Sequence, residues 1–390
     1  MSTGSGTRVY VLGDNWLPGV GGLENHTAAL TDRLSATVPV EILTSESNTE
    51  DHGNPAVPVR RFPVVGDAGY YEGVREHLLA AREQGPFVLH VMGFSYFWPE
   101  AQARLVQEVA HRTGCPVVLK VPTSGHALRY LTAEFRAARA SVSAFVCLNS
   151  GVYREIRDGG VPAHRIVALP NGVDTRRFRV TDRAARAAAR ARHGVGPDET
   201  VALFVGRLTS QKRVDLLVDA VSAANAEGLR LLLVGPSDAT YGPAFDTRGL
   251  PAGVTWLGAT KSPERHYALA DVYVSTSLAE GMPNSGLEAM ASGLPLLVSD
   301  IPGHRELVHA GRNGWLVPPA VADFATALAQ LPARERLEVM GEESRRRAET
   351  EFSLVSVTDR YLQLYRHVLA AASDGAGPAG IRTGRRDGEA

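Results

Sequence analysis

Short apolar runs alternate with helix-like stretches along this sequence, and the alternation occurs twice. In the first half, RVYVLGD, PFVLHVM and PVVLKVP are separated by stretches such as LENHTAALTDRLS and AQARLVQEVAHRTG. The apolar residues of these runs are continuous, which is typical of parallel strands covered by helices on both faces. The rhythm restarts after residue 200 with VALFVGR, LRLLLVG and LPLLVSD. The pattern predicts two doubly wound α/β domains in tandem.

A Pro-Asn-Gly turn within IVALPNGVDTRRF (166–178) lies between the two halves, and we place the hinge near residues 170–175. A chain of 390 residues is also too long for one ordinary core. The Ala/Arg run that follows the turn, RAARAAARARH, is interpreted as a solvated helix rather than a nucleic-acid-binding arm. We expect one domain over 1–172, a second over 173–352, a helix over 353–372 and a disordered tail over 373–390.

Charge and composition exclude several classes of function. The 41 basic and 42 acidic residues leave a formal charge of -1, so nothing favours a nucleic-acid partner, and an anionic ligand must be bound locally. The two cysteines lie in or beside apolar runs and have no metal-ligand spacing, so they are predicted to be reduced core residues. The sequence has no GxSxG or P-loop motif to support a hydrolase or a kinase, and no DxD or HxH pair near the candidate loops to imply a metal. The N-terminus has neither a signal-peptide nor a membrane-span pattern, so the cytoplasm is the expected location.

The strongest chemical signal is the stretch EGMPNSGLE, which joins a strand pattern to a helix pattern and has an acid at each end, Glu280 and Glu288. Its small residues leave backbone N–H groups accessible at a helix N-terminus, which favours a phosphate or diphosphate. Ser285 or Asn284 could cap that helix. Carboxylates would repel phosphate, so we assign the two acids to hydroxyl groups, one on a ribose and one on a hexose. A capping box with an incidental acid is the alternative.

Three further elements carry weaker signals. Arg207 and Lys212 follow the strand VALFVG, at the strand end where ligands bind in doubly wound folds, and could neutralise a diphosphate without a metal. Each could equally be an ordinary surface cation. The glycines of Gly19–Gly22 would allow a close approach of backbone to ligand, although the full GxGxxG pattern is missing. Lys120 and His126 bracket a turn in KVPTSGH, where a lone histidine is more often structural.

Together, GVGG, GRLTSQKR, the E-x7-E segment and SDIPGHRELVHAGRNGWLVPP resemble the family 4 retaining glycosyltransferases with the GT-B fold. The resemblance covers roughly residues 8–370, and LPNGVD, LADVYVS and GWLV occur in the order that the family shows. It implies two Rossmann-like domains that face each other across a cleft, the first binding acceptor and the second binding the nucleotide-sugar donor. It also implies that the last helix crosses back onto the first domain.

The resemblance implies a role for each matching residue. Arg207 and Lys212 would hold the donor diphosphate, Glu288 the ribose, and Glu280 the transferred sugar, with His126 contacting the sugar from the opposite side. Met282 and Pro283 replace the aromatic and glycine that are frequent in the family, which leaves open which hexose hydroxyls are bound. The donor-binding set is Gly21, Gly22, Arg207, Lys212, Gly258, Ala259, Thr260, Gly281, Met282, Pro283, Asn284, Ser285, Gly286, Leu287 and Glu288. The nucleobase would lie against Leu257–Thr260.

The acceptor is expected to bind in loops of the first domain, whose residues mix aromatic and polar groups. The candidates are Asn15, Trp16, Glu24, Met92, Phe94, Lys120 and Thr123. This mixture suits a small polyol or aminocyclitol as well as a glycan, and we expect a soluble, small acceptor of the kind used in natural-product assembly. The one stretch that could hold a lipid acceptor, RYLTAEFRAARASV, is a weak amphipathic candidate.

The expected reaction moves a hexose-type sugar, with retention, from a nucleoside diphosphate sugar to an acceptor hydroxyl, without metal or cofactor. UDP is the expected nucleotide, with GDP and ADP open. The alternatives are a transferase for a glycan or lipid-linked acceptor, a sugar-nucleotide 2-epimerase, and a non-catalytic subunit that binds sugar nucleotides and regulates a partner. The protein is expected to be a monomer or homodimer without membrane association.

Overall fold

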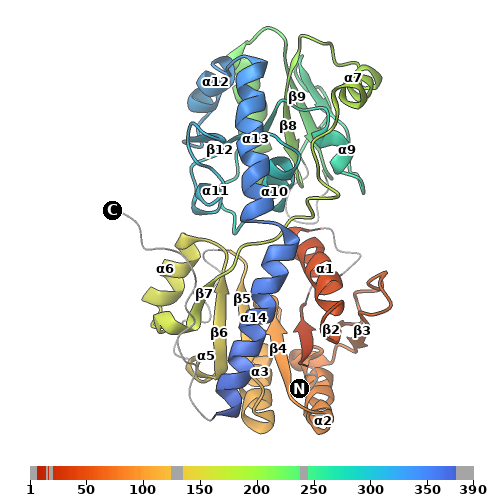
Figure 1. Cartoon of the computed structure of the whole chain (residues 1–390), viewed down its shortest axis with the longest axis vertical. Helices are drawn as coiled ribbons and strands as arrows, with labels where there is room; N and C mark the ends of the chain where they lie inside the picture. The colour runs from red at the N-terminus through yellow and green to blue at the C-terminus, as the bar shows by residue number, and fades with distance from the viewer. Residues whose placement is uncertain are drawn as a thin grey trace. The chain divides into compact units, whose positions relative to one another are not determined.

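The computed structural model of the chain describes residues 7–14, 16, 21–95, 97–123, 135–237 and 245–374. The chain divides into two compact units, and each is described by itself (Figure 1). Unit 1 comprises Met1–Asn171 and Leu354–Ala390, and unit 2 comprises Gly172–Ser353. The second segment of unit 1 includes the last helix of the chain, and residues 375–390 of the expected tail lie outside the described residues.

The described part of unit 1 contains a seven-stranded parallel sheet in the order β3-β2-β1-β4-β5-β6-β7. Its strands are β1 (Arg8–Leu12), β2 (Val40–Ser45), β3 (Val59–Phe62), β4 (Phe87–Val91), β5 (Val117–Val121), β6 (Val142–Cys147) and β7 (Ile166–Ala168). All residues of β4 and β5 are buried, which explains their continuous apolar sequences. The chain reverses its direction of travel across the sheet between β1 and β4.

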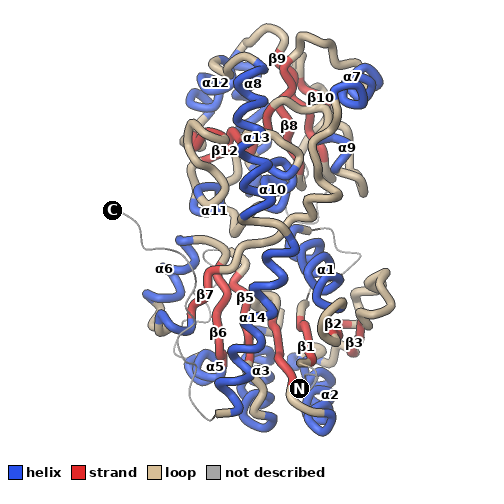
Figure 2. Tube along the Cα trace, viewed as in Figure 1, coloured by secondary structure: helices blue, strands red, loops and turns tan. Residues whose placement is uncertain are grey.

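Helices cover both faces of this sheet, as Figure 2 shows in blue around the red strands. They are α1 (Gly22–Ser35), α2 (Tyr71–Ala81), α3 (Pro99–Thr113), α5 (Arg136–Ser141), α6 (Ser150–Asp158) and α14 (Leu354–Ser373). One core cluster joins the sheet to α2, α3 and α6, and the other joins it to α1 and α14. The last helix therefore completes the core of unit 1, although 182 residues of unit 2 precede it in the chain.

The described part of unit 2 contains a six-stranded parallel sheet in the order β10-β9-β8-β11-β12-β13. Its strands are β8 (Thr200–Val205), β9 (Leu229–Val234), β10 (Val254–Trp256), β11 (Val272–Ser275), β12 (Leu296–Ser299) and β13 (Gly314–Val317). Its helices are α7 (Arg183–Arg192), α8 (Val214–Ala224), α9 (Glu264–Tyr267), α10 (Asn284–Ala291), α11 (Pro302–Arg305), α12 (Val321–Ala329) and α13 (Arg334–Thr350). The prediction of two doubly wound parallel-sheet domains is confirmed.

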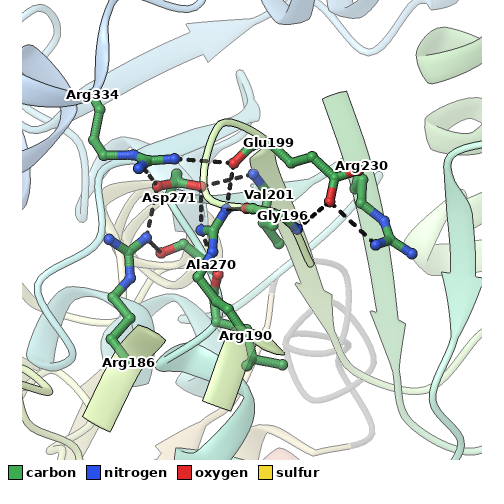
Figure 3. Close-up of polar contacts among 10 residues, drawn as sticks. Arg186, Arg190, Gly196, Glu199, Val201, Arg230, Ala270, Asp271 and Arg334 are labelled. Carbon is green, nitrogen blue, oxygen red and sulfur yellow. Dashed lines mark hydrogen bonds and ion pairs between the residues drawn. The ribbon is translucent and has the colours of Figure 1, made fainter. Parts of the chain in front are cut away.

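A cluster of arginines around one buried aspartate ties the amino-terminal edge of the second sheet together (Figure 3). Asp271, directly before β11, binds Arg186 at 2.6 Å, Arg190 at 2.9 Å and Arg334 at 3.3 Å, and accepts the Val201 backbone N–H at 2.8 Å. Burial alone would raise the pKa of Asp271, but the Val201 N–H and the arginines outweigh it and lower that pKa. Two arginines of α7 therefore anchor this helix. Most of its other residues are exposed, so the prediction of a solvated helix is confirmed except at this anchor.

Substitution of Asp271 tests this anchor. The Asp271→Asn variant leaves three arginines around a neutral group that is almost fully enclosed, so unit 2 should lose about 3–5 kcal/mol of stability in urea unfolding at pH 7. Because the native pKa of Asp271 is depressed, the difference between variant and parent should shrink as the pH falls below the ordinary carboxyl pKa. Asp246→Asn, which removes an exposed ion pair with Arg248, is the matched control and should have no measurable effect. Equal unfolding midpoints for both variants would contradict the assignment.

Candidate functional site

The predicted donor residues of unit 2 lie at the carboxyl end of its sheet. Arg207 and Lys212 follow β8, and the stretch from Glu280 to Glu288 follows β11. The strands β8 and β11 are hydrogen-bonded neighbours, and the strand order reverses between them. This topological switch point is where doubly wound sheets bind ligands.

Hydrogen bonds fasten the loop after β11 to the turn after β8. The Leu278 backbone N–H donates to Gln211 O at 2.9 Å, and the Gln211 side chain donates to Ala279 O at 2.8 Å. The Thr276 hydroxyl donates to Lys212 O at 3.0 Å. The two loops are therefore held in register, and the side chains of Lys212 and Glu280 meet as a result.

The ammonium of Lys212 binds the carboxylate of Glu280, and these side chains are 22% and 10% exposed. Burial alone would raise the pKa of Glu280, but the charge of Lys212 and hydrogen bonds from Lys212 and Ser277 bring it below the ordinary value. Glu280 is therefore ionised at neutral pH. The residue predicted to bind the diphosphate, Lys212, is therefore in direct contact with the residue predicted to bind the sugar, Glu280.

Glu288 lies on α10 and is held by a buried tyrosine that the sequence analysis did not identify. The hydroxyl of Tyr267 lies 2.8 Å from Glu288 Oε2 and 3.1 Å from Ser285 O. Burial raises the pKa of Glu288 to about 7, against the hydrogen bond from Tyr267 and the charge of Arg177, which lower it. The carboxyl can therefore gain or lose a proton near neutral pH.

The start of α10 differs from the prediction. Pro283 stands in the capping position and has no side chain that can cap the helix, while Asn284 and Ser285 are already helical. The Ser285 hydroxyl instead pairs with the Tyr273 hydroxyl at 2.8 Å. The prediction of a Ser285 or Asn284 cap is wrong, because the proline fixes the extended turn one residue earlier.

Packing from β12 and α11 supports the backbone at Glu280. A Cβ atom on Gly303 would lie 2.5 Å from Glu280 O, so only glycine fits against this carbonyl. The Ser299 hydroxyl donates to Ser277 O at 2.6 Å, and His304 Nδ1 lies 2.8 Å from Ser299 O. Burial lowers the pKa of His304 to about 4, so its ring is neutral. The sequence analysis did not identify His304, because its position near this loop arises from tertiary packing.

The remaining donor candidates lie on neighbouring loops at the same end of the sheet. Arg207 is half-buried at the turn that follows Gly206. The segment from Leu257 to Thr260 follows β10, and Gly258 O accepts the Gly235 backbone N–H at 2.8 Å. The loops after β8, β9, β10 and β11 are thus connected.

In unit 1, the predicted residues divide into buried and half-buried ones. Lys120 is fully buried, and its ammonium donates to Asn171 Oδ1 at 2.9 Å. The same ammonium lies 3.1 Å from His26 Nδ1. Trp16 is buried and donates from its indole to Glu50 O. Met92 is also buried.

Phe94 and Thr123 are half-buried. Gly21 and Gly22 begin α1, and a Cβ atom on Gly21 would overlap the carboxylate of the buried Glu24. Asn15 and His126 lie outside the described residues. The predicted acceptor contacts therefore stay predictions.

Neither a metal cluster nor a membrane span is found in the part of the chain that the structure describes. No group of three or more His, Cys, Asp or Glu side chains there could hold a metal ion. None of the described helices is long and apolar enough to cross a bilayer.

Comparison with known proteins identifies the family. Residues 20–177 match the model for "Glycosyltransferase Family 4", and residues 199–334 match the model for "Glycosyl transferases group 1". The D-inositol 3-phosphate glycosyltransferase of Rhodococcus jostii is 34% identical over 60% of this chain and 54% of its own length. The GDP-mannose-dependent alpha-(1-6)-phosphatidylinositol monomannoside mannosyltransferase of Mycobacterium tuberculosis is 34% identical over 46% of this chain and 50% of its own. The chain thus spans about half the length of these relatives.

Solved structures with the same fold cover nearly the whole chain. The Anabaena protein HepE, crystallised with UDP and glucose, superposes with a TM-score of 0.74 at 17% identity, over 92% of this chain and 99% of its own. Sucrose-phosphate synthase from Thermosynechococcus elongatus superposes with a TM-score of 0.72 at 20% identity, over 94% and 100%. Both family models and both folds agree with the motifs in the sequence. The chain belongs to the family 4 glycosyltransferases and has their GT-B fold.

Proposed function

We propose that the chain is a retaining glycosyltransferase that moves a hexose-type sugar from a UDP-sugar to a hydroxyl of a small soluble acceptor in the cytoplasm. The observation that carries this proposal is the Lys212–Glu280 ion pair, with Glu288 eight residues further on, at the switch point of the second sheet. The pair offers a cation for phosphate and an anion for sugar hydroxyls within one small space. Family membership supports the same reading.

The ion pair would separate when the donor binds. Lys212 and Arg207 would turn to the diphosphate, together with backbone N–H groups at the start of α10, where the helix dipole favours an anion. Glu280, released from Lys212, would accept hydrogen bonds from hydroxyl groups of the transferred sugar. Glu288 would accept hydrogen bonds from the two ribose hydroxyls.

The same cations would stabilise the charge that develops on the leaving diphosphate. We infer that the acceptor hydroxyl attacks from the face that the diphosphate leaves, with the departing phosphate as base, which retains the anomeric configuration. No metal is invoked, because Arg207 and Lys212 supply the positive charge. Aminocyclitol natural products are the acceptors that we favour, and a glycan or lipid-linked acceptor is the competing choice.

A donor panel tests the function as a whole. Among UDP-, GDP- and ADP-sugars, a UDP-sugar should raise the melting temperature of the chain most, and the protein should slowly hydrolyse that donor in the absence of acceptor. A non-catalytic binding subunit would be stabilised without hydrolysis. Stabilisation by none of the three donors would contradict the proposal.

The raised pKa of Glu288 predicts that donor binding depends on pH. Ribose hydroxyls bind the ionised carboxylate, so binding should release a proton below pH 7, and affinity should rise by up to about tenfold per pH unit from pH 5 to 7 and then level off. A UDP-sugar is the probe, because its esterified diphosphate does not titrate in this range. Calorimetry in buffers with different ionisation enthalpies counts the proton.

Glu288→Gln cannot titrate, so its weaker binding should show no slope with pH and no proton release. Tyr267, Arg177 and Glu264, which face this carboxyl, are unchanged in that variant. A pH slope that persists in Glu288→Gln would assign the proton to another group.

Substitution of Glu280 separates turnover from affinity. Glu280→Gln keeps the shape of the side chain but removes the charge that faces the reacting sugar, so kcat should fall by about 100-fold while donor affinity changes little. Steady-state kinetics with the preferred donor measure both. Glu338→Gln, an exposed glutamate of α13, is the control and should behave as the parent. A loss confined to KM would contradict the role of Glu280.

A further inference from the structure

The carboxyl end of the first sheet carries a carboxylate that the donor site does not use. Asp14, two residues after β1, accepts hydrogen bonds on Oδ1 from the hydroxyls of Tyr70, at 2.9 Å, and Tyr71. Its second oxygen, Oδ2, is enclosed and has no hydrogen-bond partner among the described residues. A carboxylate oxygen in such a place needs a donor, and the residues that the structure describes around it supply none.

The groups that hold Asp14 are buried and packed against one another. Tyr70 and Tyr71 are 0% and 2% exposed, and their rings stack at 4.5 Å, with Trp98 edge-on to both. Gln102 donates to the Tyr71 hydroxyl at 3.3 Å and to Gly93 O at 3.2 Å. Burial also raises the pKa of both tyrosines, so their hydroxyls remain protonated donors.

These residues converge where a ligand is expected. Asp14 follows β1, and Gly93 follows β4, which is the neighbour of β1 across the reversal of strand order. The tyrosines begin α2, and Gln102 lies in the first turn of α3. Four elements thus orient one carboxylate at the switch point of unit 1, the counterpart of the position that Lys212 and Glu280 occupy in unit 2.

The sequence of the loops that follow β1 to β4 carries charge of one sign. The sequence of the loops after β1 to β4, residues 13–21, 46–58, 63–70 and 92–98, contains no lysine or arginine. These loops carry the carboxylates of Asp14, Glu46, Glu50, Asp51 and Asp67. The loop after β2 touches Asp14 directly, since the Asn48 side chain donates to Asp14 O at 2.9 Å. Two cations on strands of this sheet already have partners: Arg61 on β3 is paired with Asp51, and Lys120 on β5 donates to Asn171 Oδ1.

We propose that Asp14 is a specificity-determining residue that binds an ammonium group of the acceptor, so that the acceptor is an aminated polyol and not a phosphorylated one. The inference rests on the proposed function and specifies its acceptor. An ammonium supplies the missing donor to Oδ2 and matches the acidic loops, whereas a phosphate would meet uncompensated like charge. Tyr70 and Tyr71 are positioning residues for the carboxylate.

Direct binding to the full chain tests the proposal without any need for turnover. Calorimetry with scyllo-inosamine, myo-inositol and myo-inositol 1-phosphate should rank the amine tightest and the phosphate weakest, by about tenfold or more between the extremes. Asp14→Asn should weaken the amine about tenfold and myo-inositol much less. Asp158→Asn, an exposed charge removal on α6, is the matched control.

Tyr71→Phe keeps the charge but removes one of the two bonds to Oδ1, so it should weaken the amine severalfold. The ranking of the three probes on the parent chain stands even if a variant folds poorly. Tightest binding of the phosphate, or equal binding of the amine by the parent and a folded Asp14→Asn, would overturn the proposal. The donor panel reports on unit 2 separately, so failure of this acceptor assignment and failure of the transferase function are distinguishable.

Discussion

The contact on which the proposed donor site depends is the ion pair between Lys212 and Glu280, held in place by hydrogen bonds between two loops. The positions of these two side chains depend on contacts between the two loops. The Leu278 backbone N–H and the Thr276 hydroxyl donate to the turn after β8 and bring the charges together, and Gly303 packs against the carbonyl of Glu280 from the other side. Without ligand, the pair neutralises two charges that would otherwise be buried alone. The proposed donor, which carries both phosphate and hydroxyl groups, offers each member a replacement partner.

The two units have the same reversal of strand order but different charged groups beside it. In each sheet the strand order reverses once between neighbouring strands, and a carboxylate lies at that point. In unit 2 the carboxylate of Glu280 is balanced by a lysine, which suits an anionic ligand that also carries hydroxyls. In unit 1 the carboxylate of Asp14 accepts hydrogen bonds from two neutral tyrosines among the described residues, and the proposed ammonium group would balance its charge. The fold repeats, and the local charge distinguishes the two sites.

The sequence predicted those features that depend on local pattern. Continuous apolar runs indicated the parallel sheets, because strands such as β4 are covered on both faces. The motif order indicated the family, and strand-end placement indicated that Lys212 and Glu280 share one edge. Contacts that arise only from tertiary packing could not be predicted. Tyr267 lies 21 residues from Glu288, and Tyr71 lies 57 residues from Asp14.

The sequence analysis was incomplete or wrong where a contact depends on tertiary packing. The alanines of α7 indicated a solvated helix, and most of that helix is exposed, but they did not indicate that Arg186 and Arg190 bind the buried Asp271. Ser285 has the chemistry of a helix cap, yet its hydroxyl pairs with Tyr273 because Pro283 has already begun the turn. In both cases a buried polar group has a partner that the local sequence did not reveal.

A crystal structure of the chain with a bound UDP-sugar would test the central claim most directly. The account predicts that the diphosphate contacts Lys212, that Lys212 has left Glu280, and that the ribose hydroxyls bind Glu288. A nucleotide bound elsewhere in unit 2, or bound at this edge with the Lys212–Glu280 pair intact, would contradict it.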